Sequence, residues 1–249
     1  MFRLSSIQAL KPLWRRAPTG PRPQLAQPLQ RLQRRNFSQP TSQHNIATSL
    51  SKTCPSCGTA LPTPLPVCPT CRYIARIHPS ISFHELFGLP YDPNPFIVDL
   101  VLLRRRFLEA QRVSHPDAWA TKNDDLRDAA LDVSNAVNTA YKTLLTPLHR
   151  VEYILRRQGI ETEEADQLED LDLITEVMEA REEIDSIQPG NIERLRSLEG
   201  ENDAKVQDTM ETIKGLIASK DWKEVKTAAV RLKYLQGIQD AIKQRVDNM

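Results

Sequence analysis

The sequence lacks several features that would point to common classes of protein. No run of about 18 consecutive apolar residues occurs in its 249 residues, so a membrane-spanning helix is not expected. Its eight glycines form neither a G-x-G-x-x-G nor a G-x-x-x-x-G-K-[ST] motif, which argues against a nucleotide-binding core. Four cysteines are too few, in a chain of this length, for a scaffold held together by disulfides. A chain that is 26% charged and 40% hydrophobic is typical of one or two globular domains.

Acidic residues are missing altogether from the first third of the chain. Residues 1–84 contain eleven Lys and Arg and no Asp or Glu, whereas residues 85–249 carry a net charge of −10. Proline follows the same division, because fifteen of the eighteen prolines precede residue 96. The overall net charge of +1 therefore conceals at least two segments of different character.

Residues 1–37 are rich in arginine and free of acidic residues, which is the composition of a mitochondrial transit peptide. Arg35-Asn36-Phe37-Ser38 is similar to a matrix-peptidase site, with Arg three residues before the cut and Ser after it. A disordered basic tail and a nucleic-acid-binding arm are the alternatives. We expect a transit peptide over 1–37, a mitochondrial matrix location, and a linker over 38–53, where no hydrophobic period is present.

Two copies of a C-P-x-C unit follow, Cys54–Cys57 and Cys68–Cys71, with ten residues between them. Each C-x-x-C turn directs two sulfurs at one centre, and two such turns complete a tetrahedral four-thiolate site for zinc. A segment of about 25 residues cannot bury a core of its own, so we expect the metal to fold the module over 54–78. A redox-active C-x-x-C would be expected beside a βαβ pattern, which is absent. No histidine or open ligand position suggests catalysis, so the zinc is predicted to be structural.

An all-α region begins after this module. Ser82 is predicted to cap a short helix over 83–87, and helical periodicity extends from Phe96 to Val113. A second helix is predicted from Asp124 to Leu145, so two antiparallel helices flank the tripeptide His115-Pro116-Asp117. The arginines of the first helix lie away from its apolar face; they are Arg104, Arg105, Arg106 and Arg112.

The arrangement helix, H-P-D, helix, preceded by F-x-x-L-F-G-L, resembles a J domain, here over 80–158. Asn138-x-Ala-Tyr141-x-x-Leu144, leading to Pro147-x-x-Arg150-x-x-Tyr153-Ile-Leu, resembles more particularly the HscB family of iron–sulfur co-chaperones, whose eukaryotic members carry a four-cysteine module. The resemblance implies that His115, Pro116, Asp117 and the four arginines bind a heat-shock chaperone of the seventy-kilodalton class and trigger its ATP hydrolysis. The alternative is that H-P-D is only a turn between two helices.

Residues 161–249 are predicted to form an antiparallel three-helix bundle. The helical patterns cover about 165–187, 191–218 and 221–247, and each has one apolar stripe for a core. Leu171, Ile174 and Met178 form a second stripe on the first helix, displaced by about 100–160° from its core stripe. Tyr234 likewise lies away from the core position Leu232. This extra apolar surface either packs against the preceding domain or receives a partner.

The HscB resemblance favours a partner, because members of the family hold the iron–sulfur scaffold protein, of IscU type, through this helix pair. The residues of this chain that match the scaffold-binding positions are Ile174, Met178, Tyr234, Glu179, Glu182 and Lys233.

The expected function is therefore that of a co-chaperone without catalytic residues of its own, which brings a cluster-loaded scaffold to the chaperone. A zinc-containing nucleic-acid-binding protein is one rival, but a net charge of −10 over 85–249 would repel a phosphate backbone. A metal-dependent enzyme is another, but no His/Glu cluster lies on one helix face. Neither nucleic acid nor a membrane is an expected partner.

Overall fold

The computed structural model of the chain describes residues 46–47, 49–161, 171–188 and 190–248. The predicted transit peptide and the first part of the helix predicted over 165–187 lie outside these residues. None of the helices that the structure describes is long and apolar enough to cross a membrane.

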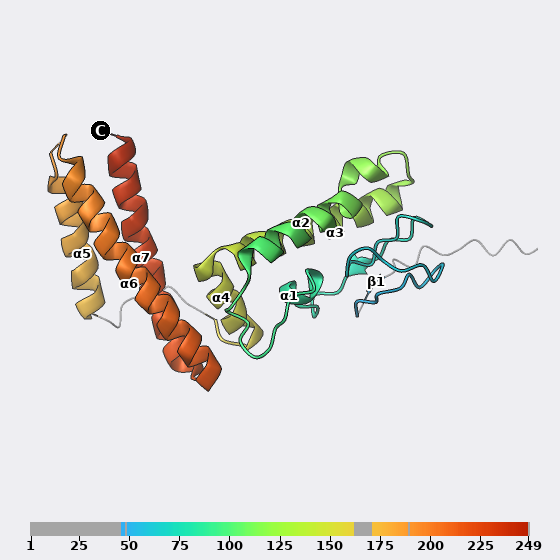
Figure 1. Cartoon of the computed structure of the whole chain (residues 1–249), viewed down its shortest axis with the longest axis horizontal. Helices are drawn as coiled ribbons and strands as arrows, with labels where there is room; N and C mark the ends of the chain where they lie inside the picture. Colours follow the sequence, from blue (N-terminus) through green and yellow to red (C-terminus); the bar gives the residue numbers. More distant parts are fainter. Residues whose placement is uncertain (1–45, 48, 162–170, 189, 249) are drawn as a thin grey trace, which may run out of the picture. The chain divides into compact units, whose positions relative to one another are not determined.

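The described residues form two short strands, seven α-helices and one 3₁₀ turn (Figure 1), which confirms the predicted all-α fold. The elements are β1 (Ile46–Ala47), β2 (Arg76–Ile77), α1 (Phe83–Leu86), α2 (Leu100–Ser114), η1 (Pro116–Trp119), α3 (Asp124–Leu145), α4 (Pro147–Arg157), α5 (Leu171–Ser186), α6 (Ile192–Ser219) and α7 (Trp222–Asp247).

The strand β1 lies inside the segment that was predicted to be a linker. Ile46 and Ala47 pair in parallel with Arg76 and Ile77, so part of residues 38–53 is ordered against the far end of the cysteine module. The apolar period could not indicate this strand, because two residues are too short to show one.

Helices α2 and α3 form the predicted antiparallel pair. The bounds of α3 agree with the prediction at both ends, because the Asn123 side chain caps its start and Pro147 follows its end. The start of α2 was predicted wrongly at Phe96. The side chain of Asp99 accepts hydrogen bonds from the amides of Val101 and Leu102, and this cap begins the helix at Leu100.

Phe96 is instead held in the loop before α2 by Arg150 of α4. The Arg150 guanidinium donates to the Phe96 carbonyl at 2.8 Å and to the Leu144 carbonyl at 2.7 Å, and it lies 5.4 Å from the centre of the Phe96 ring. The same side chain therefore satisfies a loop carbonyl and one of the unpaired carbonyls at the end of α3. Burial lowers the pKa of Arg150 to about 10, which leaves it charged at neutral pH.

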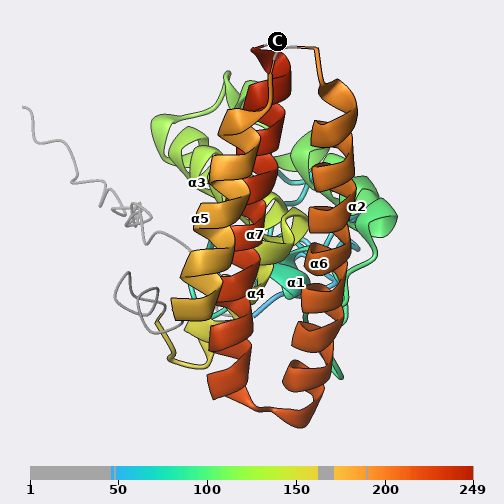
Figure 2. The ribbon, with the colours of Figure 1, turned by 90° about the vertical axis from the view of Figure 1, so that its left-hand side faces the viewer.

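The C-terminal helices α5, α6 and α7 lie side by side (Figure 2) and form the predicted bundle. Glu176 of α5 pairs with Lys205 of α6 at 2.7 Å and with Arg231 of α7 at 3.4 Å. Further along α5, Glu183 pairs with Arg194, which precedes Lys205. Helix α6 therefore runs antiparallel to α5. Arg245 of α7 donates to the Asp185 carbonyl, so α7 runs parallel to α5.

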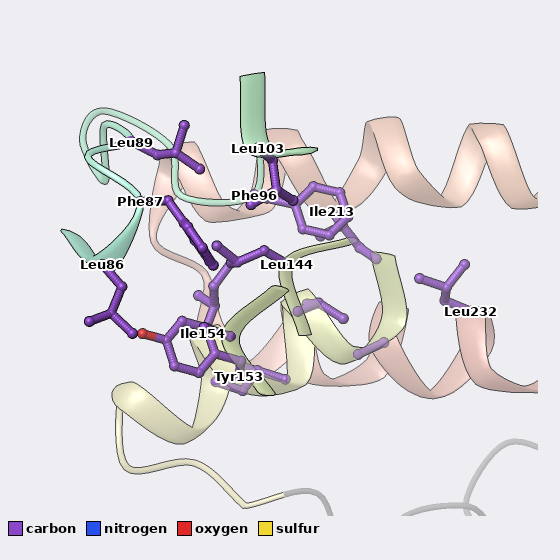
Figure 3. Close-up of a cluster of buried hydrophobic side chains, with 14 of the residues drawn as sticks. Leu86, Phe87, Leu89, Phe96, Leu103, Leu144, Tyr153, Ile154, Ile213 and Leu232 are labelled. Atoms are coloured by element: carbon purple, nitrogen blue, oxygen red, sulfur yellow. The ribbon is translucent and has the colours of Figure 1, made fainter. Parts of the chain in front are cut away.

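The core continues from the hairpin into the bundle (Figure 3). Buried residues from all seven described helices contribute to it, including Leu86, Leu103, Leu144, Ile154, Val177, Ile213 and Leu232. Asn94, in the loop before α2, also donates a hydrogen bond from its side-chain amide to the Lys214 carbonyl of α6 at 2.9 Å. The two helical regions that the sequence predicts as separate domains thus share buried apolar surface.

Candidate functional site

The H-P-D loop (His115–Asp117) joins α2 to the turn η1. His115 is both the C-cap residue of α2 and the N-cap residue of η1. Its ring Nδ1 accepts a hydrogen bond from the Asp117 amide at 3.3 Å. Pro116 occupies the first position of the turn, where its missing amide hydrogen costs nothing. The imidazole and the Asp117 carboxylate both remain exposed. The loop is therefore held in one shape while its two polar side chains face solvent.

Trp119, which no motif in the sequence indicates, anchors one end of this loop. Its side chain is buried, and its indole Nε1 donates to the Val113 carbonyl in the last turn of α2. Helix α3 is joined to the same end of α2, since the side-chain amide of Gln111 donates to Asn138 Oδ1 at 2.7 Å.

The four arginines of α2 differ in their exposure. Arg104, Arg105 and Arg112 are exposed. Arg106 differs, because it is half-buried and its guanidinium pairs with Glu109 at 3.0 Å. The cationic surface beside the H-P-D loop therefore consists of Arg104, Arg105 and Arg112, and Arg106 borders it.

The four cysteines lie together as the doubled motif predicts. Their sulfurs are all within 4.8 Å of one another, with Cys54 Sγ 3.6 Å from Cys71 Sγ and Cys57 Sγ 3.7 Å from Cys68 Sγ. Sulfurs bound to one tetrahedral zinc at about 2.3 Å would be roughly 3.8 Å apart, so the donor set fits a zinc ion.

Each pair of cysteines sits in a tight turn of the same design. The amide of Gly58 donates to the Cys54 carbonyl at 2.9 Å, and the amide of Arg72 donates to the Cys68 carbonyl at 3.0 Å. Both residues have a positive φ, which glycine adopts easily and arginine adopts at a cost. Hydrogen bonds with the hydroxyl and backbone of Thr59 lower the pKa of Cys57 to about 6, whereas desolvation and the hydrogen bond with Cys57 raise the pKa of Cys71 to about 11. A metal would require all four as thiolates.

The second apolar stripe of α5 is largely uncovered. Leu171 is 73% exposed and Met178 is 58% exposed, whereas Val177 between them is buried. These two side chains therefore do not pack against the hairpin. Ile174 is half-buried, and Glu179, Glu182 and Lys233 are exposed.

Tyr234 differs from the expectation that it points away from the core. It is half-buried and packs against the hydrophobic core. Because α5 and α7 are parallel and Glu176 pairs with Arg231, Met178 and Tyr234 lie at about the same level along the bundle. The angular position of Tyr234 around α7 alone could not predict that it packs against the core, because that position does not include the neighbouring helices.

The chain is similar in sequence to a family model and to known proteins. Residues 169–243 match the family described as the HSCB C-terminal oligomerisation domain. The co-chaperone protein HscB homolog of Aliivibrio salmonicida is 32% identical over 174 residues, which cover 68% of this chain and 99% of that protein. The chain belongs to the HscB family of co-chaperones.

Two human comparisons agree with this HscB assignment. The iron-sulfur cluster co-chaperone protein HscB of Homo sapiens is 29% identical over 177 residues, which cover 71% of this chain and 73% of that protein. The crystal structure of human co-chaperone protein HscB matches with a TM-score of 0.67 at 26% identity, covering 79% of this chain and 100% of that one. The resemblance inferred from the sequence is thereby confirmed.

Proposed function

We propose that this HscB-family chain is a mitochondrial J-type co-chaperone with a structural zinc site. It stimulates the ATPase of a seventy-kilodalton-class heat-shock chaperone and delivers the iron–sulfur scaffold to it for cluster release and transfer. The observation that carries the proposal is the H-P-D loop, exposed at its tip, anchored by buried Trp119, and adjoined by Arg104, Arg105 and Arg112.

The hairpin α2–α3 serves as the J domain in this proposal. The ATPase site belongs to the chaperone, so the chain contributes a docking surface and no catalytic group. Its arginines attract an acidic partner surface and orient the encounter. His115, Pro116 and Asp117 then contact the chaperone with a loop shape that is already set, which reduces the ordering cost of binding.

The surface of α5 and α7 serves as the scaffold-binding site. Ile174, Met178 and Tyr234 supply the apolar anchors, and Glu179, Glu182 and Lys233 on the same two helices present exposed charges. Apolar anchors with a charged rim are the usual composition of a protein interface. The hairpin and the bundle share buried apolar residues, so the two proposed binding surfaces belong to helices that pack on one core.

The four cysteines would hold zinc in a structural role. Zinc bound by four thiolates has no open position for substrate, so it supplies only a crosslink between the two turns. Leu65, Val67 and Ile74 of this module are buried in the common core, and Arg76 pairs with Asp132 of α3 at 2.8 Å. The crosslink therefore stabilises a module that packs on the hairpin.

The ATPase rate of the purified chaperone tests this function. We expect the rate to rise when this protein is added and to rise more than additively when the scaffold is added as well. An unchanged rate with both proteins present would contradict the proposal. Mitochondrial location is tested separately, by fusing residues 1–45 to a fluorescent protein. Import should be lost when the arginines of 1–37 are replaced by glutamine.

A further inference from the structure

Two exposed apolar side chains lie among the arginines on the outward side of α2. Val101 is 82% exposed and Leu108 is 55% exposed, whereas Leu103 and Ala110 on the other side of the helix are buried. Residues 101, 105, 108 and 112 follow one another at intervals of four, three and four, so they form one line along the helix surface. This α2 stripe (Val101, Arg105, Leu108, Arg112) alternates apolar and cationic side chains.

A single exposed leucine would need no explanation, because isolated apolar residues are common on protein surfaces. Here two of them are about 10 Å apart on one stripe, with Arg105 between them. The arginines on this side of α2 are also largely available to pair with acidic residues of a partner protein. Among the residues that the structure describes, Arg104 and Arg112 have no ion-pair partner, and Arg105 is only within 4.0 Å of Glu109. The stripe ends at Arg112, three residues before His115, so it leads directly to the H-P-D loop.

We propose that Val101 and Leu108 are apolar anchors of the contact with the chaperone, whose docking surface is acidic and has apolar recesses opposite the α2 stripe. This proposal rests on the proposed function. The charges of Arg104, Arg105 and Arg112 select an acidic partner, and the continuity of the stripe with the H-P-D loop assigns that partner as the chaperone.

The two kinds of side chain contribute different parts of the affinity. Contacts between exposed charges are weakened by salt, so the arginines mainly govern the rate of encounter at low ionic strength. Apolar side chains that enter a partner's recess lose contact with water, and this contribution persists at high salt. The chain is therefore expected to keep a salt-resistant part of its chaperone affinity that comes from Val101 and Leu108.

A lipid surface is the other occupant that a cationic and apolar helix face suggests. Helices that bind in the membrane interface present a broad apolar face, whereas α2 exposes three large apolar side chains, Leu100, Val101 and Leu108, with arginines between them, and its opposite side is buried in the core. The chaperone is therefore the favoured occupant, and binding to anionic vesicles becomes an outcome of the test.

The test compares the double variant Val101→Thr/Leu108→Gln with Leu131→Gln. Leu131 is 48% exposed, similar to Leu108, but it lies on α3, outside the α2 stripe, with Arg127 and Asn135 one turn before and after it. All of these positions are exposed, so circular dichroism melting should be nearly unchanged. The measurement is the concentration of each protein that gives half-maximal stimulation of the chaperone ATPase, at low and at high ionic strength.

We expect the double variant to need about tenfold more protein at both ionic strengths, and the Leu131→Gln control to stay within about twofold of the wild type. Arg112→Glu should lose affinity mainly at low ionic strength.

A double variant that behaves like the control, while the wild type stimulates normally, would overturn the anchor proposal and leave the proposed function standing. The anchor proposal is also overturned if the double variant loses only binding to vesicles that contain anionic phospholipid. A wild-type protein that does not stimulate the chaperone at all would overturn the proposed function, and the anchors with it.

Discussion

The indole Nε1 of Trp119 donates a hydrogen bond to the carbonyl oxygen of Val113 at 3.1 Å, across the H-P-D loop. The carbonyls in the last turn of a helix have no partner within that helix, and Trp119 supplies one for α2. Because Trp119 ends the turn η1 and Val113 lies just before the loop, this bond fixes both ends of residues 114–118.

Replacing Trp119 by Phe is expected to loosen the loop without unfolding the protein. The ring remains apolar, the lost hydrogen bond costs about 1 kcal/mol, and the smaller ring leaves a cavity that lowers the stability further. We expect the maximal stimulation of the chaperone ATPase to fall several-fold, and the backbone amide resonances of His115 and Asp117 to broaden or shift. Trp222→Phe, at the start of α7, is the matched control and should leave both measurements unchanged. Unaltered loop resonances and full stimulation in Trp119→Phe would show that the bond does not position the loop.

Replacing Ile174, Met178 and Tyr234 by Ala should weaken the scaffold complex at least a hundredfold, about 2.7 kcal/mol. The effect on stability should be small for the exposed Met178 and larger for Tyr234, which packs against the core. Calorimetric titration with the scaffold and thermal melting are measured on the same variants.

Val177→Ala is the control for this surface, because it lies on the buried side of α5. It should lower the melting temperature and leave scaffold affinity nearly unchanged. If Met178→Ala melts early and binds the scaffold normally, the second apolar stripe belongs to the bundle core and not to an interface.

Residues 38–249 should bind about one zinc ion through Cys54, Cys57, Cys68 and Cys71. Because Leu65, Val67 and Ile74 are buried in the common core, removing the metal should also lower the thermal stability of the hairpin. Acid should release the zinc, since protons compete for the thiolates. Metal analysis and native mass spectrometry are the measurements. A metal-free protein with a Cys54–Cys57 or Cys68–Cys71 disulfide would contradict this expectation.

The sequence predicts those elements whose determinants are local. Helix α3 agrees with its predicted bounds because Asn123, the acidic first turn and Pro147 all lie next to its ends. The four cysteines could be assigned to one site because their spacing repeats. The helix α4 was not predicted as an element, although Pro147 at its first position is a recognised start signal.

Features that depend on distant partners could not be predicted in the same way. Phe96 continues the apolar period of α2, yet it is held in a loop by Arg150, 54 residues away. Trp119 and Tyr234 take their roles from contacts with other elements, and no pattern within their own segments indicates them. The Asp99 cap was the one local signal that would have placed the start of α2 correctly.

His84 should make stability depend on pH. It is fully buried, its Nε2 donates to the Pro95 carbonyl at 2.8 Å, and its Nδ1 has no hydrogen-bond partner among the described residues. Burial, with smaller effects from Arg150 and Arg157, lowers its pKa below the ordinary value; the rings of Tyr91 and Tyr153 are its other titratable neighbours. The unfolded chain therefore binds a proton at about pH 6.5 while the folded chain does not.

The free energy of unfolding should thus be steady with respect to this group above about pH 6.5 and fall as the pH drops below it, by at most about 1.4 kcal/mol per pH unit. His84→Gln keeps a side-chain donor for the Pro95 carbonyl and cannot titrate, so its stability should fall less steeply. Urea unfolding of both proteins across this pH range gives the difference. Equal slopes would mean that His84 does not contribute.

The chaperone ATPase rate with His115→Gln tests the central claim most directly. His115 is exposed, and its side chain accepts a hydrogen bond from the Asp117 amide at Nδ1, so the variant should melt within a few degrees of the wild type. We expect wild-type protein to stimulate the chaperone ATPase and His115→Gln to leave it at the basal rate, with scaffold binding unchanged. Normal stimulation by folded His115→Gln would show that this chain does not act on the chaperone through its H-P-D loop.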